Sequence, residues 1–238
     1  MLLPTLTVRD WWRNLVYHAL KLLAWLILRL GFGLRVVGQQ HLPKAGAFLI
    51  ASNHVSFLDP AVVAVACPRR LVFVARSDLF GVPWLGAFMR FMGVIPVHRN
   101  ETGLGLRHAV RVLRQGQPVA IFPEGGRQFS GTLGRAQPGV GLLAAEAHVP
   151  VIPVFLHGTF EAWPPQARMI RPAKIRVAFG PPIRYPVGRL PAHPQSFGAG
   201  GSDEAYQALA DQVTASWQQL ASTLHGRDTR SITHDAAS

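Results

Sequence analysis

Residues 47–60 read AFLIASNHVSFLDP, and this stretch decides the predicted fold. Its first five residues form an uninterrupted apolar run, which is typical of a buried central strand in an α/β sheet. Asp59 precedes Pro60, and proline suits the first position of a helix, so we expect a helix over 60–66 with Asp59 as its N-cap. His54 then falls in the strand-to-helix connection, where open α/β sheets usually bind their ligands.

His54 and Asp59 are the first candidates for catalysis. On one continuous helix their spacing would turn the two side chains about 140° apart, but a loop that enters a helix removes this obstacle. A carboxylate that accepts the proton of one imidazole nitrogen leaves the other nitrogen basic and free to act on a hydroxyl. The same residues also suit a hydrogen-bonded loop histidine and a simple helix cap, so the pattern alone leaves both interpretations open.

Four blocks of the sequence resemble, in order, those of the glycerolipid acyltransferase family, which includes 1-acylglycerol-3-phosphate (lysophosphatidate) acyltransferase. The first block is Asn53-His54 followed by Asp59, and the others are GVIPVHR at 93–99, FPEGGR at 122–127 and VPVIPV at 149–154. Four blocks in family order are far more specific than one dyad. Gly126 and Gln128 depart from the family pattern, because Thr and Ser are usual at these positions.

The resemblance implies a fold and a catalytic pair. The fold is α/β, with a mixed central β-sheet flanked by helices as in glycerol-3-phosphate acyltransferase. His54 would be the general base that takes a proton from the acceptor hydroxyl, and Asp59 would stabilise the resulting imidazolium. No covalent enzyme intermediate is required.

Arg99 and the segment Glu124-Gly125-Gly126-Arg127 are the candidate substrate-binding residues. Arginine holds phosphate in a bidentate fork, and glycines let backbone N–H groups approach an anion. In the family the third block, which here is FPEGGR at 122–127, is implicated in glycerol-phosphate binding. We expect Glu124 to order the loop or an arginine rather than to contact phosphate, because like charges repel. Arg99 is equally compatible with an ordinary surface position.

Composition narrows the possible partners without choosing among them. The 238 residues are 49% hydrophobic and 15% charged, with 24 Lys and Arg against 12 Asp and Glu and a net charge of +12. This balance indicates an anionic partner, such as nucleic acid, an acidic membrane surface or a phosphorylated substrate. The sequence carries no nucleic-acid-binding fingerprint, so we expect no nucleic acid. Cys67 is the only cysteine, which excludes a disulfide within the chain.

The N-terminal region 11–34 is strongly apolar, but Arg13, Lys21 and Arg29 interrupt it. Its uncharged runs are far shorter than the roughly 20 residues that a membrane-spanning helix needs. We therefore expect a helix in the membrane interface, with these cations near anionic lipid. A helix packed on the protein's own core is the alternative, and both can hold on different faces. The aromatic residues expected at the headgroups are Trp11, Trp12, Tyr17 and Trp25. The predicted location is peripheral or monotopic, on the cytoplasmic face of a membrane.

Apolar periodicity and turn residues predict the order of elements. The expected strands are 34–38, 47–51, 71–75, 94–97, 118–122, 151–156 and 175–179, and the helices after the first are 60–66, 83–92, 103–115, 139–148 and 202–225. The expected organisation is an interfacial helical segment at 1–34, an acyltransferase domain at 35–184, a Pro/Gly-rich loop at 185–201, a C-terminal helix at 202–225 and a disordered tail at 226–238.

The expected reaction moves a fatty acyl group from acyl-CoA or acyl carrier protein to the sn-2 hydroxyl of 1-acylglycerol 3-phosphate, giving phosphatidic acid. Beyond this thioester co-substrate no cofactor or metal is expected. Another lysophospholipid or glycerol 3-phosphate remains an alternative acceptor. Two other classes remain open: a metal hydrolase that uses His54 and Asp59 as ligands, and a non-enzymatic basic module that binds membranes.

Overall fold

A seven-stranded mixed sheet forms the centre of the protein in the computed structural model, which describes residues 8–97, 102–185 and 200–235. The strand order is β1-β7-β6-β2-β5-β3-β4, where β6 and β7 are antiparallel and every other neighbouring pair is parallel. The strands are β1 Arg35–Val37, β2 Leu49–Ser52, β3 Val72–Arg76, β4 Ile95–Val97, β5 Val119–Ile121, β6 Val151–His157 and β7 Arg176–Phe179. The predicted mixed α/β fold is confirmed.

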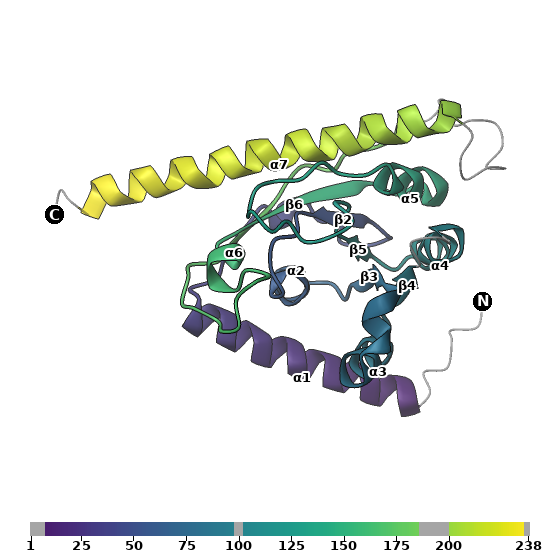
Figure 1. Cartoon of the computed structure of the whole chain (residues 1–238), viewed down its shortest axis with the longest axis horizontal. Coiled ribbons are helices and arrows are strands. Elements are labelled where there is room, and N and C mark those ends of the chain that lie inside the picture. The colour runs from purple at the N-terminus through teal and green to yellow at the C-terminus, as the bar shows by residue number, and fades with distance from the viewer. Residues whose placement is uncertain (1–7, 98–101, 186–199, 236–238) are drawn as a thin grey trace.

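Helices cover both faces of this sheet (Figure 1). Helices α1 (Val8–Gly31) and α2 (Asp59–Ala66) lie on one face, and α3 (Pro83–Met92) packs against α1. Helices α4 (Thr102–Arg114), α5 (Gly139–Ala147) and α7 (Gly200–Asp235) lie on the other face. The short elements are α6 (Thr159–Ala162) and the 3-10 helices η1 (Gln39–His41) and η2 (Ser77–Gly81).

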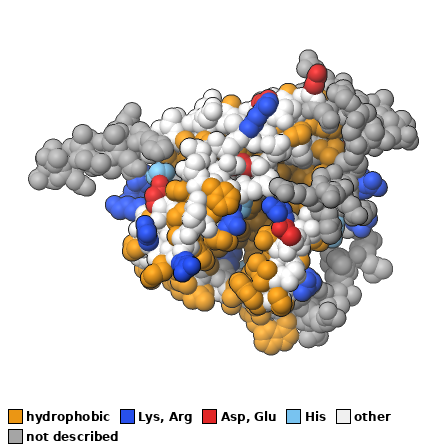
Figure 2. Space-filling model, viewed as in Figure 1, with side chains coloured by type: hydrophobic (Ala, Val, Ile, Leu, Met, Phe, Trp, Pro, Cys, Tyr) orange, Lys and Arg blue, Asp and Glu red, His pale blue; other side chains and the backbone are white. Residues whose placement is uncertain are grey.

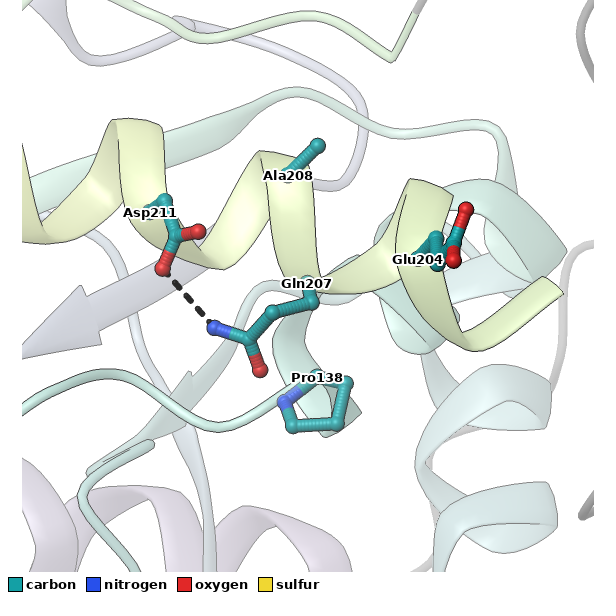
Figure 3. Close-up of a pocket in the computed structure, with 5 residues that line it drawn as sticks. All are labelled: Pro138, Glu204, Gln207, Ala208 and Asp211. Atoms are coloured by element: carbon teal, nitrogen blue, oxygen red, sulfur yellow. Dashed lines mark hydrogen bonds between the residues drawn. The ribbon is translucent and has the colours of Figure 1, made fainter. Parts of the chain in front are cut away.

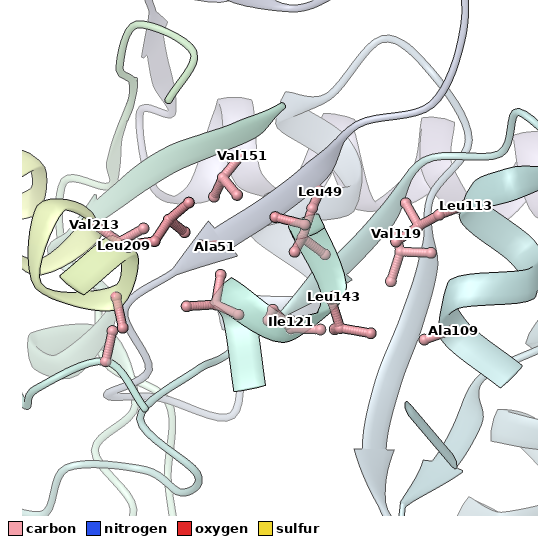
Figure 4. Close-up of a cluster of buried hydrophobic side chains, with 14 of the residues drawn as sticks. Leu49, Ala51, Ala109, Leu113, Val119, Ile121, Leu143, Val151, Leu209 and Val213 are labelled. Carbon is pink, nitrogen blue, oxygen red and sulfur yellow. The ribbon is translucent and has the colours of Figure 1, made fainter. Parts of the chain in front are cut away.

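The alternation of side chains along each strand divides the core into two clusters. Leu49 and Ala51 of β2 point toward α5 and α7, where they join the apolar cluster of Figure 4. Ile50, between them in sequence, points to the opposite face and packs with residues of α1 and α2. Because β2 is buried on both faces, it reads as a continuous apolar run, and it fixes the position at which residue 53 leaves the sheet.

Helix α7 is longer than the sequence predicted. It runs from Gly200 to Asp235, so the expected end at residue 225 and the expected disorder from 226 are wrong for residues 226–235. Gly226 suggested a helix end, but glycine costs only about 1 kcal/mol relative to alanine inside a helix. No proline stands between residues 200 and 235 to force a stop.

Helix α1 is fastened to the protein by polar contacts that the sequence did not reveal. Tyr17 is buried, with 3% of its surface exposed. The Lys21 ammonium donates to the Cys67 carbonyl at 2.6 Å, and the Arg29 guanidinium donates to the Leu34 carbonyl at 3.0 Å. The expectation that Tyr17 meets lipid headgroups is corrected, because its side chain is inside the protein. Lys21 and Arg29 each donate to a carbonyl of the protein, and Arg29 remains exposed.

A second side of α1 remains open and apolar. Hydrophobic side chains gather toward the lower edge of the face in Figure 2, where α3 and α1 lie. The most exposed of them are Trp12, Leu22, Leu23, Ile27 and Leu30 on α1 and Trp84 and Phe88 on α3. Among the described residues, no helix combines the length and the hydropathy needed to cross a membrane. The side chains of Trp11 and Arg13 lie outside the described part.

Candidate active site

The carboxyl ends of the parallel strands bring the predicted site residues to one edge of the sheet. His54 follows β2, Glu124 and Arg127 follow β5, and Arg76 ends β3. Strands β2, β5 and β3 are parallel neighbours, so their carboxyl ends meet at the same edge. Residues separated by up to 73 positions in sequence, from His54 to Arg127, thereby face a common space.

His54 and Asp59 form a hydrogen-bonded pair. The His54 Nδ1 and Asp59 Oδ2 atoms are 2.8 Å apart, and Asp59 is completely buried while 17% of the His54 side chain is exposed. The same carboxylate oxygen accepts the N–H groups of Val55 and Ser56, each at 2.7 Å. With Nδ1 donating to Asp59, Nε2 is the nitrogen that remains to accept a proton. The imidazole also stacks on the Phe122 ring, with 4.2 Å between ring centroids.

The predicted N-cap role of Asp59 is wrong. Helix α2 begins at Asp59 itself, and no side chain caps it. An N-cap side chain bonds to N–H groups ahead of it in the helix, whereas the Asp59 carboxylate turns back to Val55 and Ser56 in the preceding loop. The residue therefore orders the loop that carries His54, and it holds the imidazole in one orientation.

Glu124 and Gln128 hold the backbone of His54 from both sides. The Glu124 carboxylate accepts the His54 N–H at 3.0 Å, and the Gln128 N–H donates to the His54 carbonyl at 2.8 Å. The pKa of Glu124 is raised from 4.5 to about 7, chiefly by burial; the bond from the His54 N–H opposes this shift, and the negative charge of Asp59 adds a smaller part of it. The segment after β5 is thus coupled directly to the position of the imidazole.

Arg127 places a positive charge beside the pair. Its guanidinium carbon lies 3.6 Å from the centroid of the Phe57 ring, and its buried Nη1 has no hydrogen-bond partner among the described residues. Burial lowers the pKa of Arg127, while the charge of Asp59 raises it and the charge of Arg76 lowers it. An unpaired buried donor next to a second cation is suited to an anionic group of a ligand.

Arg76 is the residue near this site that the sequence assignment missed. Its charge acts on Arg127, and it makes a bidentate ion pair with Asp78, with N–O distances of 3.0 and 2.6 Å. Its position at the end of a predicted strand was a signal, because strand ends at this edge carry the other site residues. Arg99, the predicted phosphate ligand, lies outside the described residues.

Gly125 and Gly126 border open space. A Cβ atom added to either glycine would meet nothing within 4 Å, and Gly125 has a φ of +77°. Only Gly125 therefore needs the conformational freedom of glycine. At Gly126 the chain leaves room where the family usually carries a threonine side chain.

Two hollows in the described part of the protein are lined by neither residue of the catalytic pair. A cavity of about 200 Å³ lies beside the site, where Asn53 and Val55, on either side of His54, meet Gly131, Leu133, residues 155–158 and residues 160–161. Asn53 closes its inner side, because its amide bonds the N–H and the carbonyl of Leu156 at 2.7 and 3.1 Å.

The second hollow is a shallow groove between α7 and the start of α5 (Figure 3). Pro138, Glu204, Gln207, Ala208 and Asp211 line it. None of these residues is a cation or a histidine, so the groove offers neither an imidazole base nor a cationic ligand for phosphate.

The described residues give little support to metal or thiol chemistry. Within 8–97, 102–185 and 200–235, no three His, Cys, Asp or Glu side chains gather as metal ligands would. Cys67 is buried, and burial raises the pKa of its thiol, which disfavours the nucleophilic thiolate. The arrangement that remains is the hydrogen-bonded His54–Asp59 pair beside Arg127, whose buried Nη1 is unpaired within the described residues.

Known proteins share this sequence pattern. A 1-acyl-sn-glycerol-3-phosphate acyltransferase of Limnanthes alba is 31% identical over 188 residues, which cover 77% of this chain and 65% of that protein. The chloroplastic 1-acyl-sn-glycerol-3-phosphate acyltransferase LPAT1 of Arabidopsis thaliana is 28% identical over 186 residues, which cover 76% of this chain and 52% of that protein. The chain thus spans between about half and two thirds of the length of these plant relatives.

The fold also has a solved counterpart. The crystal structure of the 1-acyl-sn-glycerophosphate (LPA) acyltransferase PlsC from Thermotoga maritima matches with a TM-score of 0.67, over 91% of this chain and 84% of that chain. At 21% sequence identity this likeness shows a shared fold. Residues 33–157, more than half of the chain, match the family model described as Acyltransferase. The His54–Asp59 pair and the arginines Arg76 and Arg127 lie within that match. This chain belongs to the acyltransferase family.

Proposed function

We propose that this protein transfers a fatty acyl group from a thioester to the sn-2 hydroxyl of 1-acylglycerol 3-phosphate, giving phosphatidic acid. The observation that carries the proposal is the His54–Asp59 hydrogen bond of 2.8 Å next to an arginine, Arg127, whose buried Nη1 is unpaired within the described residues. The names of the relatives from Limnanthes and Arabidopsis support the same acceptor.

The pair supplies the base for this reaction. His54 Nε2 takes the proton of the acceptor hydroxyl while the hydroxyl oxygen attacks the thioester carbonyl carbon. The ester C–O bond forms, the C–S bond breaks, and the departing thiolate recovers the proton from the imidazolium. Asp59 stabilises that imidazolium and is itself held by the N–H groups of Val55 and Ser56.

The arginines supply the site for the phosphate. Arg127 offers an unpaired N–H group, and Arg76 adds positive charge from the end of β3. We assign Arg99 and the N–H groups of Gly125 and Gly126 to the same phosphate. Glu124 positions His54 and does not bind the phosphate, because its carboxylate accepts the His54 N–H.

The acceptor has one alternative that a specific feature favours. The open space beside Gly126 leaves room where the family usually has a threonine side chain. A lysophospholipid with a larger headgroup would use this room, whereas glycerol 3-phosphate would use less of it. The donor is acyl-CoA or acyl carrier protein, and the exposed Arg107, Arg111 and Arg114 on α4 suit the negative charge of either.

The substrate is a lipid, so we propose that the protein works as a peripheral or monotopic protein on the cytoplasmic face of a membrane. Exposed Trp12, Leu22, Leu30 and Trp84 on α1 and α3 support an apolar contact with lipid. The net charge of +12 supports attraction to anionic headgroups.

One experiment tests the proposal directly. The purified protein is offered a panel of acceptors that differ in headgroup and chain number, each with acyl-CoA and with acyl carrier protein, and esterified products are measured. We expect the highest kcat/KM for 1-acylglycerol 3-phosphate. No acyl transfer to any acceptor, together with intact lipid binding, would instead support a non-enzymatic membrane module.

A further inference from the structure

The connection between α6 and β7 carries an exposed apolar pair between two arginines. The sequence Arg168-Met169-Ile170-Arg171 presents Met169 with 77% and Ile170 with 48% of its surface exposed, and both arginines are exposed. None of the ion pairs among the described residues involves either arginine. We call residues 168–171 the apolar tip.

The apolar tip stands on a fixed base. The Trp163 indole N–H donates to the Ala167 carbonyl at 3.1 Å, and the Arg171 N–H donates to the Ala162 carbonyl at 2.8 Å. The Ser56 hydroxyl donates to the Trp163 carbonyl at 2.7 Å. The tip is thus connected to the loop between His54 and Asp59.

The base of the tip also contacts the substrate site. The rings of Trp163 and Phe57 lie 5.1 Å apart, and Phe57 is the ring on which Arg127 stacks. Arg76, whose charge acts on Arg127, leads directly into η2 and α3, where Leu79, Val82 and Trp84 are exposed. Two apolar projections, the tip and the η2–α3 segment, are therefore each connected to an arginine of the site.

Both projections lie on the α1 side of the sheet. Figure 1 shows the connection after α6 descending toward the C-terminal end of α1, and the Ile175 N–H donates to the Phe32 carbonyl at 3.0 Å. Helix α3 packs against α1 as well. The open apolar side of α1 thus connects the two projections.

We propose that the apolar tip is a second lipid contact, which inserts Met169 and Ile170 into an anionic bilayer while α1 and α3 bind the same surface. The mouth of the substrate site then opens between two lipid-bound supports. This inference rests on the proposed membrane surface and is independent of the proposed acyl transfer.

The charges at the tip favour lipid over a protein partner. Arg168 and Arg171 lie next to the apolar pair, where they would reach phosphate headgroups once Met169 and Ile170 insert. The site that the tip flanks is also cationic, through Arg76 and Arg127. A bilayer with anionic lipid satisfies both the apolar and the charged parts of this surface.

Vesicle flotation of the full chain tests the proposal. Met169→Glu is compared with Gln218→Glu, which places the same new charge on an exposed position of α7, across the sheet. Vesicles are made of phosphatidylcholine alone or of equimolar phosphatidylcholine and phosphatidylglycerol. We expect Met169→Glu to weaken binding to both about tenfold, because an apolar side chain that inserts into the bilayer is replaced by a charge. Gln218→Glu should bind as the unaltered chain does.

The arginines are tested in the same assay. The double variant Arg168→Gln and Arg171→Gln should bind about thirtyfold more weakly to the anionic vesicles only, because each arginine near an anionic surface contributes separately. Thermal unfolding of each variant confirms that the exposed substitutions leave the fold intact.

Equal binding of Met169→Glu and Gln218→Glu would overturn the second contact and leave the tip to a protein partner. If the unaltered chain itself fails to bind either vesicle, the proposed membrane surface fails with it.

Discussion

At the scale of the single residue, His54 is the side chain on which turnover depends. A positioned general base contributes roughly 10²- to 10⁴-fold, so we expect His54→Ala to lower kcat by about this factor. The imidazole packs on Phe122 at the rim of the core, so the variant should still fold. Steady-state kinetics with purified substrates measure the effect, and circular dichroism checks the fold. Unchanged kcat in the variant would remove His54 from the mechanism.

Glu124 links the site to pH. The pKa of its carboxyl is about 7 in the folded protein against 4.5 in the unfolded chain, so the folded state holds its proton more tightly. Its contribution to stability is therefore largest below about pH 4.5 and is lost as the pH rises through about 7, by about 3 kcal/mol in total. Glutamine does not titrate, so Glu124→Gln should lose this part of the pH dependence. Urea unfolding of both proteins across this range is the measurement, and parallel curves would contradict the assignment.

How much of the site could be predicted depends on the distance over which each contact forms. The His54–Asp59 pair lies within six residues, and a motif could indicate it. The contact of Glu124 with the His54 N–H spans 70 residues, and it depends on the parallel pairing of β2 with β5. Arg76 directly follows the predicted strand 71–75, but its closeness to Arg127 depends on the position of β3 next to β5. Local sequence patterns do not determine which strands are neighbours in the sheet.

At the scale of the element, Trp217 fastens α7 to the sheet. Its side chain is completely buried, and its indole N–H donates to the Ala51 carbonyl of β2 at 3.0 Å. Removing a buried tryptophan leaves a large cavity, so Trp217→Ala should lower the free energy of unfolding by about 3–5 kcal/mol. The exposed neighbour Gln218 provides a control, since Gln218→Ala should change stability by less than about 0.5 kcal/mol. Urea unfolding that showed similar small effects for both would contradict this anchoring.

Elements were predicted well where local patterns decide them. The predicted strand 47–51 and helix 83–92 match β2 and α3 within two residues, because an apolar run and a proline start are local signals. The end of α7 was not predicted, nor was it predicted that Tyr17 and Lys21 lie on the inward side of α1. Tyr17 and Lys21 look like interface residues in sequence, yet α1 packs on α2, and both side chains bind or pack there.

At the scale of the whole molecule, charge and apolar surface should respond differently to salt. The net charge of +12 attracts anionic lipid, and its reach falls from about 10 Å at 0.1 M salt to about 3 Å at 1 M. Burial of apolar side chains such as Leu30 and Trp84 is not screened in this way.

We therefore expect high salt to weaken binding to anionic vesicles without abolishing it, and to leave binding to neutral vesicles nearly unchanged. Flotation in low and high salt measures both. Complete release from anionic vesicles at high salt would mean that charge alone holds the protein to the membrane. In that case insertion of apolar side chains would not hold α1 and α3 to the membrane. These two faces would then need another partner, because their exposed side chains carry too little charge to bind lipid by electrostatic attraction alone.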